Sequence, residues 1–274
     1  GRSEAEKDTS LRRTIQKVGG DQLYLVSAED FEKIPGSPIS YWLGERTVSL
    51  FSEHKPMSDF ATAKIGLMTS DNGRFMRFSW EVSRDQCCFD AEDDDEAAVS
   101  GKRWFPHNKG GGFRRWSGNR EYLVNWQNYG DEIKKTVVGK YPYLKGNPQF
   151  VVHDEGNYFR PAISWSETGG GLPAFRYFSN GFTFNIAGIS AFPKNPDHTH
   201  KIMAFCNSAY VKKVFLAINP TLHFGANNFH SLPAAYDLPE SVADNVSHLI
   251  SSASCDWDSF ETSWDFVSLP LLSD

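Results

Sequence analysis

Turn signals divide the middle of this chain into short segments, and this division limits the fold more than any other feature. Gly169–Gly171 and Asn180-Gly181 separate several short extended segments between residues 158 and 189. Ser70–Gly73 is another turn signal, which predicts two extended segments between residues 66 and 82. Such segments exclude one long coiled coil, and an apolar content of 40% over 274 residues is ordinary for a globular protein.

Helical patterns flank these extended segments. Residues 201–218 carry apolar side chains at helical spacing up to Pro220, and residues 239–251 repeat the pattern after Pro239. The shorter segments are predicted from local signals. Short helices are expected from Ser27, from Ser58 and over 131–138, and strands over 22–26 and 122–126. Residues 1–20 are expected to fray, and the acidic run 90–96 to form an exposed loop. The sequence therefore predicts an α+β fold, with a strand-rich body, a mixed or antiparallel sheet and peripheral helices.

Charge is distributed unevenly along the chain. The net charge is −6, yet residues 101–236 carry 16 Lys and Arg against 7 acids, a balance of +9, whereas residues 1–100 and 237–274 have balances of −7 and −8. Screening limits charge effects to about 8–10 Å, so the local balance matters more than the total. We expect an N-terminal part over 1–100, a basic core over 101–236 that contacts a polyanion, and an acidic helical tail over 237–274.

The basic core opens with its most unusual stretch, residues 101–120. This stretch holds six Lys and Arg, no acid and five Gly, together with Trp104, Phe105, Phe113 and Trp116. Flexible glycine backbone lets N–H groups approach a phosphate closely, the cations supply charge, and aromatic rings can stack on bases or sugars. The composition predicts nucleic-acid binding, and the alternative is a basic surface loop whose aromatic rings enter the core.

Motifs for catalysis and for cofactors are missing. The sequence has no P-loop, no nucleophile elbow, no zinc-protease motif and no dinucleotide-binding glycine motif. His198 and His200 have a ligand-like spacing, but no nearby acid or Cys completes a metal site. We therefore predict no catalytic residue, no cofactor-binding residue and no metal ligand in this chain.

Cysteine usage and hydropathy bear on the compartment. The four cysteines form no C-x-x-C pair and are too few for a disulfide framework. Residues 1–17 are polar and contain no apolar segment of a signal peptide, and no apolar stretch approaches the ~18 residues of a membrane helix. These features predict a cytoplasmic protein with no membrane contact.

Residues 102–130 carry a family resemblance. They read K-R-W-F-P-H-N-K-G-G-G-F-R-R-W-S-G-N-R-E-Y-L-V-N-W-Q-N-Y-G, which resembles a signature block of the PglX family of adenine-specific DNA methyltransferases of BREX phage-defence systems. Further matches follow in order: Ile34–Gly36 with Tyr41-Trp42, Gly66–Phe75, Tyr158–Ser166, Asn207-Ser208, Leu232-Pro233 and Ser259–Phe266. Ala162 stands where the family usually has Gly, and the catalytic N-P-P-Y motif is absent, because Asn147-Pro148 and Asn195-Pro196 lack the second proline.

The resemblance implies a target-recognition region separated from its catalytic domain. The complete enzyme would use S-adenosylmethionine to methylate adenine N6 in double-stranded DNA, with the base flipped out of the stack. This chain would hold and read the DNA without binding the cofactor, and other BREX proteins are possible partners. The candidate DNA-binding residues are Lys102, Arg103, Lys109, Gly110, Gly111, Gly112, Arg114, Arg115, Asn119 and Arg120, with Arg160, Ser164 and Arg176 as candidates for groove contact.

Two other classes of function remain open at this stage. An aromatic content of 14%, including eight Trp, on a strand-rich body is also compatible with a carbohydrate-binding module. Exposed coplanar rings would favour sugar, whereas buried Trp beside exposed Arg would favour DNA. The acidic tail, which holds no Lys or Arg, could instead dock a basic protein in an assembly.

Overall fold

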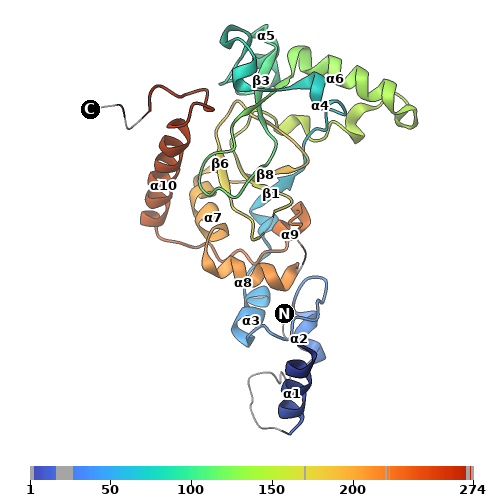
Figure 1. The fold of residues 1–274 in the computed structure, drawn as a ribbon, viewed down its shortest axis with the longest axis vertical. Coiled ribbons are helices and arrows are strands. Elements are labelled where there is room, and N and C mark those ends of the chain that lie inside the picture. The colour runs from blue at the N-terminus through green and yellow to red at the C-terminus, as the bar shows by residue number, and fades with distance from the viewer. Residues whose placement is uncertain are drawn as a thin grey trace.

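The computed structural model describes residues 3–16, 27–169, 171–219, 221, 223–269 and 272. Two four-stranded sheets lie at its centre, with helices around them (Figure 1). The first sheet has the order β1-β8-β5-β6 and is antiparallel, and the second has the order β2-β4-β3-β7 with one parallel pair, β3 with β7. The strands are β1 Ala61–Lys64, β2 Met76–Phe78, β3 Trp104–Asn108, β4 Tyr122–Asn125, β5 Ala162–Ser166, β6 Arg176–Phe178, β7 Thr183–Phe184 and β8 Gly188–Pro193. The predicted α+β class is confirmed.

Helices of very different length surround the sheets. The α-helices are α1 Glu4–Ile15, α2 Ala28–Glu32, α3 Glu45–Glu53, α4 Asn72–Phe75, α5 Asp94–Val99, α6 Gln127–Lys140, α7 Thr199–Cys206, α8 Ala209–Ile218, α9 Ala226–His230 and α10 Glu240–Asp258. Short 3₁₀ turns lie at Met57–Asp59, Ser79–Glu81, Arg84–Gln86, Pro142–Leu144, Pro148–Phe150, Glu155–Asn157 and Pro196–His198. Helices α1–α3 lie at one end of the molecule, α4–α6 at the other, and α10 along one side (Figure 1).

Apolar side chains form two large clusters. One face of the first sheet packs against α7–α10, around Trp165, Ile163 and Phe229. The other cluster joins the second sheet to α6, around Phe105, Trp126 and Val137, and it includes Ala162 and Phe192 of the first sheet. Because both clusters draw on the first sheet, its strands are buried on both faces, as the burial of β5 and β8 shows.

Strand β3 pairs with β4 along its first part and with β7 along its last part. Trp104, Phe105 and Pro106 face β4, whereas His107 and Asn108 pair with β7. All five residues are buried. The first part of the basic stretch is therefore a core strand rather than a surface loop, and it fixes the position from which residues 109–120 emerge.

Several sequence predictions are confirmed. Ser27 caps α2, 122–125 form β4, and 131–138 lie within α6. Several short strands were expected between 158 and 189, and β5–β8 are those strands, the last of which extends to Pro193. The helix from Pro239 is present and extends to Asp258, with Pro239 as its N-cap residue. The strand predicted over 22–26, the Gly19-Gly20 end of the frayed segment and the helix stop at Pro220 lie outside the described residues.

Two predictions around residues 58–82 are wrong. Residues 61–64 form a strand rather than a helix from Ser58, because β8 pairs with them and Ala61 and Ala63 alternate into the core. So short an apolar run is compatible with the spacing of a helix or of a strand, and pairing with β8 determines that a strand forms. The 66–82 hairpin does not form, since Asp71 caps α4 and β2 pairs with β4.

Three further segments differ from their predictions, and side chains that cap helices account for each difference. The helix predicted over 201–218 is two helices, because the Asn207 amide donates to and accepts from the Phe175 backbone and Ser208 caps α8. Within the acidic run, Asp93 caps α5, whose acidic first turn suits the positive end of the helix dipole. Residues 4–15 form α1, which Ser3 and Glu6 cap reciprocally. Across the described ranges, no helix is both long and apolar enough to cross a membrane.

Candidate nucleic-acid interface

The glycine loop, which we define as residues 109–120, begins at a buried polar network. The Asn108 side-chain amide donates to Ser164 Oγ at 2.6 Å and to the Gly188 carbonyl at 3.1 Å. The Asn108 Oδ1 atom accepts from the Gly110 N–H at 3.1 Å. One amide thus ties β3 of the second sheet to β5 and β8 of the first, and it fixes where the loop leaves the core.

The three consecutive glycines of the loop have different surroundings. Gly110 has a φ of +81°, and a Cβ there would lie 2.7 Å from the Ala187 carbonyl oxygen. Gly111 has a φ of +123°, and its Cβ would lie 2.8 Å from Asn119 Nδ2. A Cβ at Gly112 would meet no atom within 4 Å. Gly110 and Gly111 therefore serve the close packing of the chain on itself, and Gly112 is the one of the three with open space beside it.

The second half of the loop is attached to its neighbours along its length. The Trp116 N–H donates to the Phe175 carbonyl at 3.0 Å, and the Trp116 carbonyl accepts from the Tyr177 N–H at 2.9 Å, so the loop backbone pairs beside β6. The Asn119 amide, buried, donates to the Gly112 carbonyl at 2.9 Å and closes the loop upon itself. The second half of the loop is thus tied to β6 and to Gly112, whereas a flexible backbone was expected from the loop's glycines.

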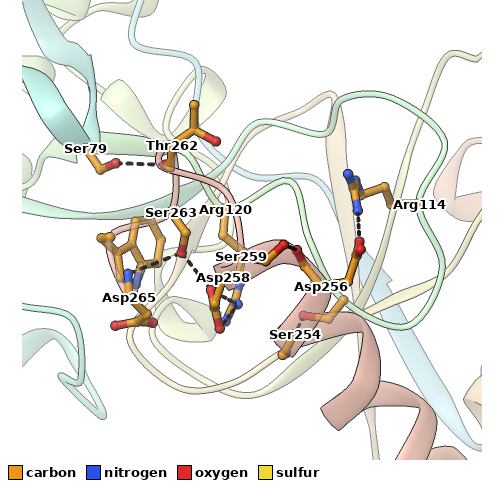
Figure 2. A network of polar contacts seen from close by, with 12 residues as sticks. Ser79, Arg114, Arg120, Ser254, Asp256, Asp258, Ser259, Thr262, Ser263 and Asp265 are labelled. Atoms are coloured by element: carbon orange, nitrogen blue, oxygen red, sulfur yellow. Dashed lines mark hydrogen bonds and ion pairs between the residues drawn. The ribbon is translucent and has the colours of Figure 1, made fainter. Parts of the chain in front are cut away.

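Two loop arginines bind carboxylates at the end of α10 (Figure 2). Arg114 lies 2.9 Å from Asp256, and its guanidinium stacks over the Trp257 ring at 5.0 Å. Arg120 lies 3.1 Å from Asp258, with only 16% of its side chain exposed. The basic loop and the acidic tail are therefore in direct contact.

The end of α10 and the chain after it secure this contact. The Ser263 hydroxyl donates to Asp258 at 2.6 Å and accepts from the Asp265 N–H at 3.2 Å (Figure 2). Ser254 donates to Ser117 at 2.8 Å. The Trp264 ring packs beside Phe89 and Phe182, 5.1 and 5.9 Å away. We call residues 254–265 the C-terminal clasp, since they hold the loop on one side and the second sheet on the other.

The remaining cations of the basic stretch have different partners. Lys102 donates to the Asp85 carbonyl at 2.5 Å, and Arg103 lies 3.5 Å from Glu132. Lys109 lies over the Tyr122 ring at 4.7 Å, and Arg115 lies over the Phe113 ring at 5.5 Å. Within the part of the chain that the structure describes, neither Lys109 nor Arg115 forms an ion pair.

The groove-contact candidates lie at different depths. Arg160 is exposed, donates to Asn157 at 3.0 Å and stacks on Phe192 at 5.6 Å. Ser164 is fully buried, where it donates to the Ile189 carbonyl at 2.7 Å and accepts from Asn108. In this structure Arg160 can meet a ligand from solvent, whereas Ser164 supports the loop from within the core.

Arg176 is the third groove-contact candidate and is only 1% exposed. Its guanidinium donates to Ser166 Oγ at 3.2 Å and, with a long contact of 3.4 Å, to the Gly112 carbonyl, while Nε has no partner among the described residues. Burial lowers the pKa of Arg176 to about 10, so the group stays charged at neutral pH. Burial raises the pKa of nearby Glu121, whose Oε2 has no hydrogen-bond partner within the described ranges.

The aromatic residues of the basic stretch also differ in their exposure to solvent. Trp104 and Phe105 are buried, whereas Phe113 is 67% exposed. Trp42 and Trp80 are the exposed tryptophans of the described chain, and Trp80 stacks face to face on Phe78 at 4.6 Å. Since those two rings cover each other, they do not form a flat surface for a sugar, and most tryptophans serve the core.

Histidines and acids form no metal site in the described ranges, where no group of three or more potential ligands comes together. His198 bonds to the Tyr236 hydroxyl at 3.2 Å, and His200 bonds to Ser247 at 3.0 Å. His107 is fully buried and bonds to Thr183 at 2.8 Å, and burial lowers its pKa to about 3. A neutral His107 therefore belongs to the framework of β3 and β7.

Sequence reasoning missed the residues that decide how the loop is held. Asp256 and Asp258 sit in a tail that reads as a solvated acidic helix, and Asn108 reads as one polar residue in a basic run. The spacing of Asp256 and Asp258 matches no motif. The one available signal was the complementary charge of the loop and the tail.

Comparisons with known proteins agree with the family resemblance. The chain is 33% identical over 276 residues to the adenine-specific methyltransferase PglX of Lacticaseibacillus casei (strain Zhang), covering 99% of this chain and 22% of that protein. It is 32% identical over 247 residues to the adenine-specific methyltransferase BrxX of Escherichia coli O9:H4 (strain HS), covering 89% of this chain and 18% of that protein. No protein-family model matches.

The chain spans about a fifth of the length of these two curated relatives. The similarity extends over nearly all of the chain, so it includes both the glycine loop and the C-terminal clasp. The resemblance predicted from residues 102–130 is confirmed: this chain is related in sequence to one segment of the adenine-specific methyltransferases PglX and BrxX.

Proposed function

We propose that the chain is a DNA-binding target-recognition region of an adenine-N6 DNA methyltransferase of the BREX type. It would position double-stranded DNA for a catalytic domain that this chain does not contain. The relatives are named adenine-specific methyltransferases, which supports a role in methylation. In the complete protein S-adenosylmethionine would supply the methyl group, and we assign no residue of this chain to it.

The observation that carries this proposal is the shape of the glycine loop. Its base is fixed by Asn108, Trp116 and the C-terminal clasp, while Gly112, Phe113 and Arg115 face solvent or lie partly exposed at the apex. A cationic, aromatic apex on a fixed base suits contact with a nucleic acid, because a preorganised site loses little entropy on binding.

The roles of the cations follow from their partners. Lys109 and Arg115, which have no carboxylate partner in the described chain, are the first choices for phosphate contact. Arg114 and Arg120 would mainly hold the loop, because Asp256 and Asp258 already neutralise them. Arg160, exposed two residues before β5, stays a candidate for direct contact.

The remaining candidates have supporting roles in this proposal. Lys102 and Arg103 flank β3, and each already has a partner in the chain. Gly110, Gly111, Asn119 and Ser164 would shape the loop rather than contact DNA. A bacterial chain with this role would act in the cytoplasm, where its DNA is, and other defence proteins would be its further partners.

Fluorescence anisotropy with labelled DNA duplexes of two different sequences tests the proposal. The 274-residue chain and its Lys109→Ala and Arg115→Ala variants are titrated at one salt concentration, with Arg13→Ala on the distant helix α1 as the matched control. We expect each loop variant to weaken binding about equally on all sequences, and the control to bind as the parent does. Equal affinities for all four proteins, or no binding by the parent chain, would overturn the proposal.

A further inference from the structure

A shallow groove lies where the glycine loop meets the start of α8. Arg115 of the loop and Lys212 of α8 both line it, together with the apolar residues Leu172, Pro173 and Phe215. The groove encloses only about 10 Å³, roughly the space of one water molecule, so no base can enter it. A ligand of this groove would lie along it from the solvent side.

The two cations of the groove are available to such a ligand. Lys212 is exposed, and Arg115 is partly exposed with its guanidinium over the Phe113 ring. Within the described chain, neither side chain forms an ion pair or a hydrogen bond, whereas Arg114 and Arg120 of the same loop each bind a carboxylate. The groove therefore brings two cations without carboxylate partners to one place on the surface.

The absence of acids distinguishes this groove from two other hollows of the structure. Glu167 lines the cavity beside Phe113, and Glu261 lines the cavity beside Trp80. None of the described residues that line the groove of Arg115 and Lys212 is acidic. A carboxylate would repel an anion at the other two places, whereas this groove attracts one.

The polar residues Asn207 and Ser208 also line the groove, but their hydrogen bonds lie within the chain. The Asn207 amide bonds to the Phe175 backbone, and Ser208 Oγ accepts from the Val211 N–H at 3.3 Å. These two residues fix the wall of the groove. The cations are the groups left for a ligand, and cations of this kind position a phosphate without reading the sequence of the bases.

We propose that Lys212 is a further phosphate contact and that the backbone of one DNA strand lies across the groove, over Arg115 and Lys212. The inference rests on the proposed DNA-binding function and extends its surface from the glycine loop to α8. Val211 and Val214 of this helix are buried in the cluster that covers the first sheet, so α8 presents Lys212 from a packed support.

The salt dependence of binding tests the proposal, with fluorescence anisotropy of a labelled DNA duplex and the 274-residue chain. Lys212→Ala should make the slope of log K against log salt concentration smaller by about 0.9, because one phosphate contact is lost. Lys213→Ala is the matched control. It removes the same charge from the next residue, about 100° around the helix and outside the lining of the groove, and should leave the slope unchanged. Lys212→Arg keeps the charge and should keep the slope of the parent chain.

The outcomes separate this inference from the proposed function. Equal slopes for the parent and Lys212→Ala, with the duplex still bound, would overturn the groove contact and leave DNA binding by the glycine loop intact. Equal reductions for Lys212→Ala and Lys213→Ala would also overturn it, since the positive field of the whole helix would then account for both. If the parent chain binds no duplex, the proposed function and this inference both fail.

Discussion

The base of the glycine loop and its apex differ in what holds their residues. At the base, Gly110 and Asn119 are buried and fit closely against neighbouring atoms, and Arg120 is covered by Asp258. At the apex, residues 112 and 113 are exposed and Arg115 has no carboxylate partner among the described residues. One run of basic and glycine-rich sequence therefore contains both framework and a surface for a ligand, and composition alone does not separate them.

Gly110→Ala should have the largest effect on stability. The left-handed φ and the 2.7 Å approach to the Ala187 carbonyl should together lower the free energy of unfolding by roughly 2–4 kcal/mol. Gly112→Ala is the matched control, and it should change stability by less than about 0.5 kcal/mol. Urea denaturation measures both, and equal effects would remove the distinction between base and apex.

Asp258→Ala should be the next largest change. It removes the hydrogen-bonded partner of a largely buried Arg120, at an expected cost of about 1.5–3 kcal/mol. Asp256→Ala breaks the more exposed pair with Arg114 and should cost under about 1 kcal/mol. The denaturant midpoints of the two variants show which ion pair stabilises the chain more. A larger loss for Asp256→Ala than for Asp258→Ala would show that the clasp acts mainly on the apex of the loop.

His107 should give the base of the loop a characteristic pH dependence. The folded chain protonates this imidazole only near pH 3, whereas the unfolded chain does so near its ordinary pKa of 6.5. The unfolded state therefore binds more protons between these values, and stability is lost as pH falls below about 6.5.

The contribution of His107 can be separated from that of the acids. Between pH 7 and pH 5 the parent chain should lose about 2 kcal/mol more than a His107→Gln variant, which keeps a neutral polar group beside Thr183. Denaturation at the two pH values measures this difference. Parallel losses in both proteins would mean that His107 titrates in the folded state as it does in the unfolded chain.

The sequence predicted those elements whose signals are local. Ser27 caps its helix, the β-prone residues of 122–126 form β4, and the glycine and Asn-Gly turns separate β5, β6 and β7. The sequence predictions were wrong where contact with a distant part of the chain determines which element forms. Residues 61–64 are a strand because β8 lies beside them, and residues 201–218 divide into two helices because the Asn207 side chain bonds to Phe175.

The candidate site shows the same limit. Six cations between residues 101 and 120 could be counted from the sequence, but their roles depend on groups far along the chain. Asp256 meets Arg114 across 142 residues, and Asp258 meets Arg120 across 138. No local pattern records such pairs, so the sequence predicted the region of the interface and not which of its cations are available to a ligand.

The salt dependence of DNA binding tests the central claim most directly. Each phosphate contact contributes a slope of about 0.9 to the fall of log K with log salt concentration. The double variant Lys109→Ala with Arg115→Ala should therefore have a slope that is smaller by about 1.8 than that of the parent chain. The control pair Arg13→Ala with Lys55→Ala, which removes exposed cations away from the loop, should leave the slope unchanged. An equal slope for the parent and the loop variant would contradict the assignment of the glycine loop as the phosphate-binding surface.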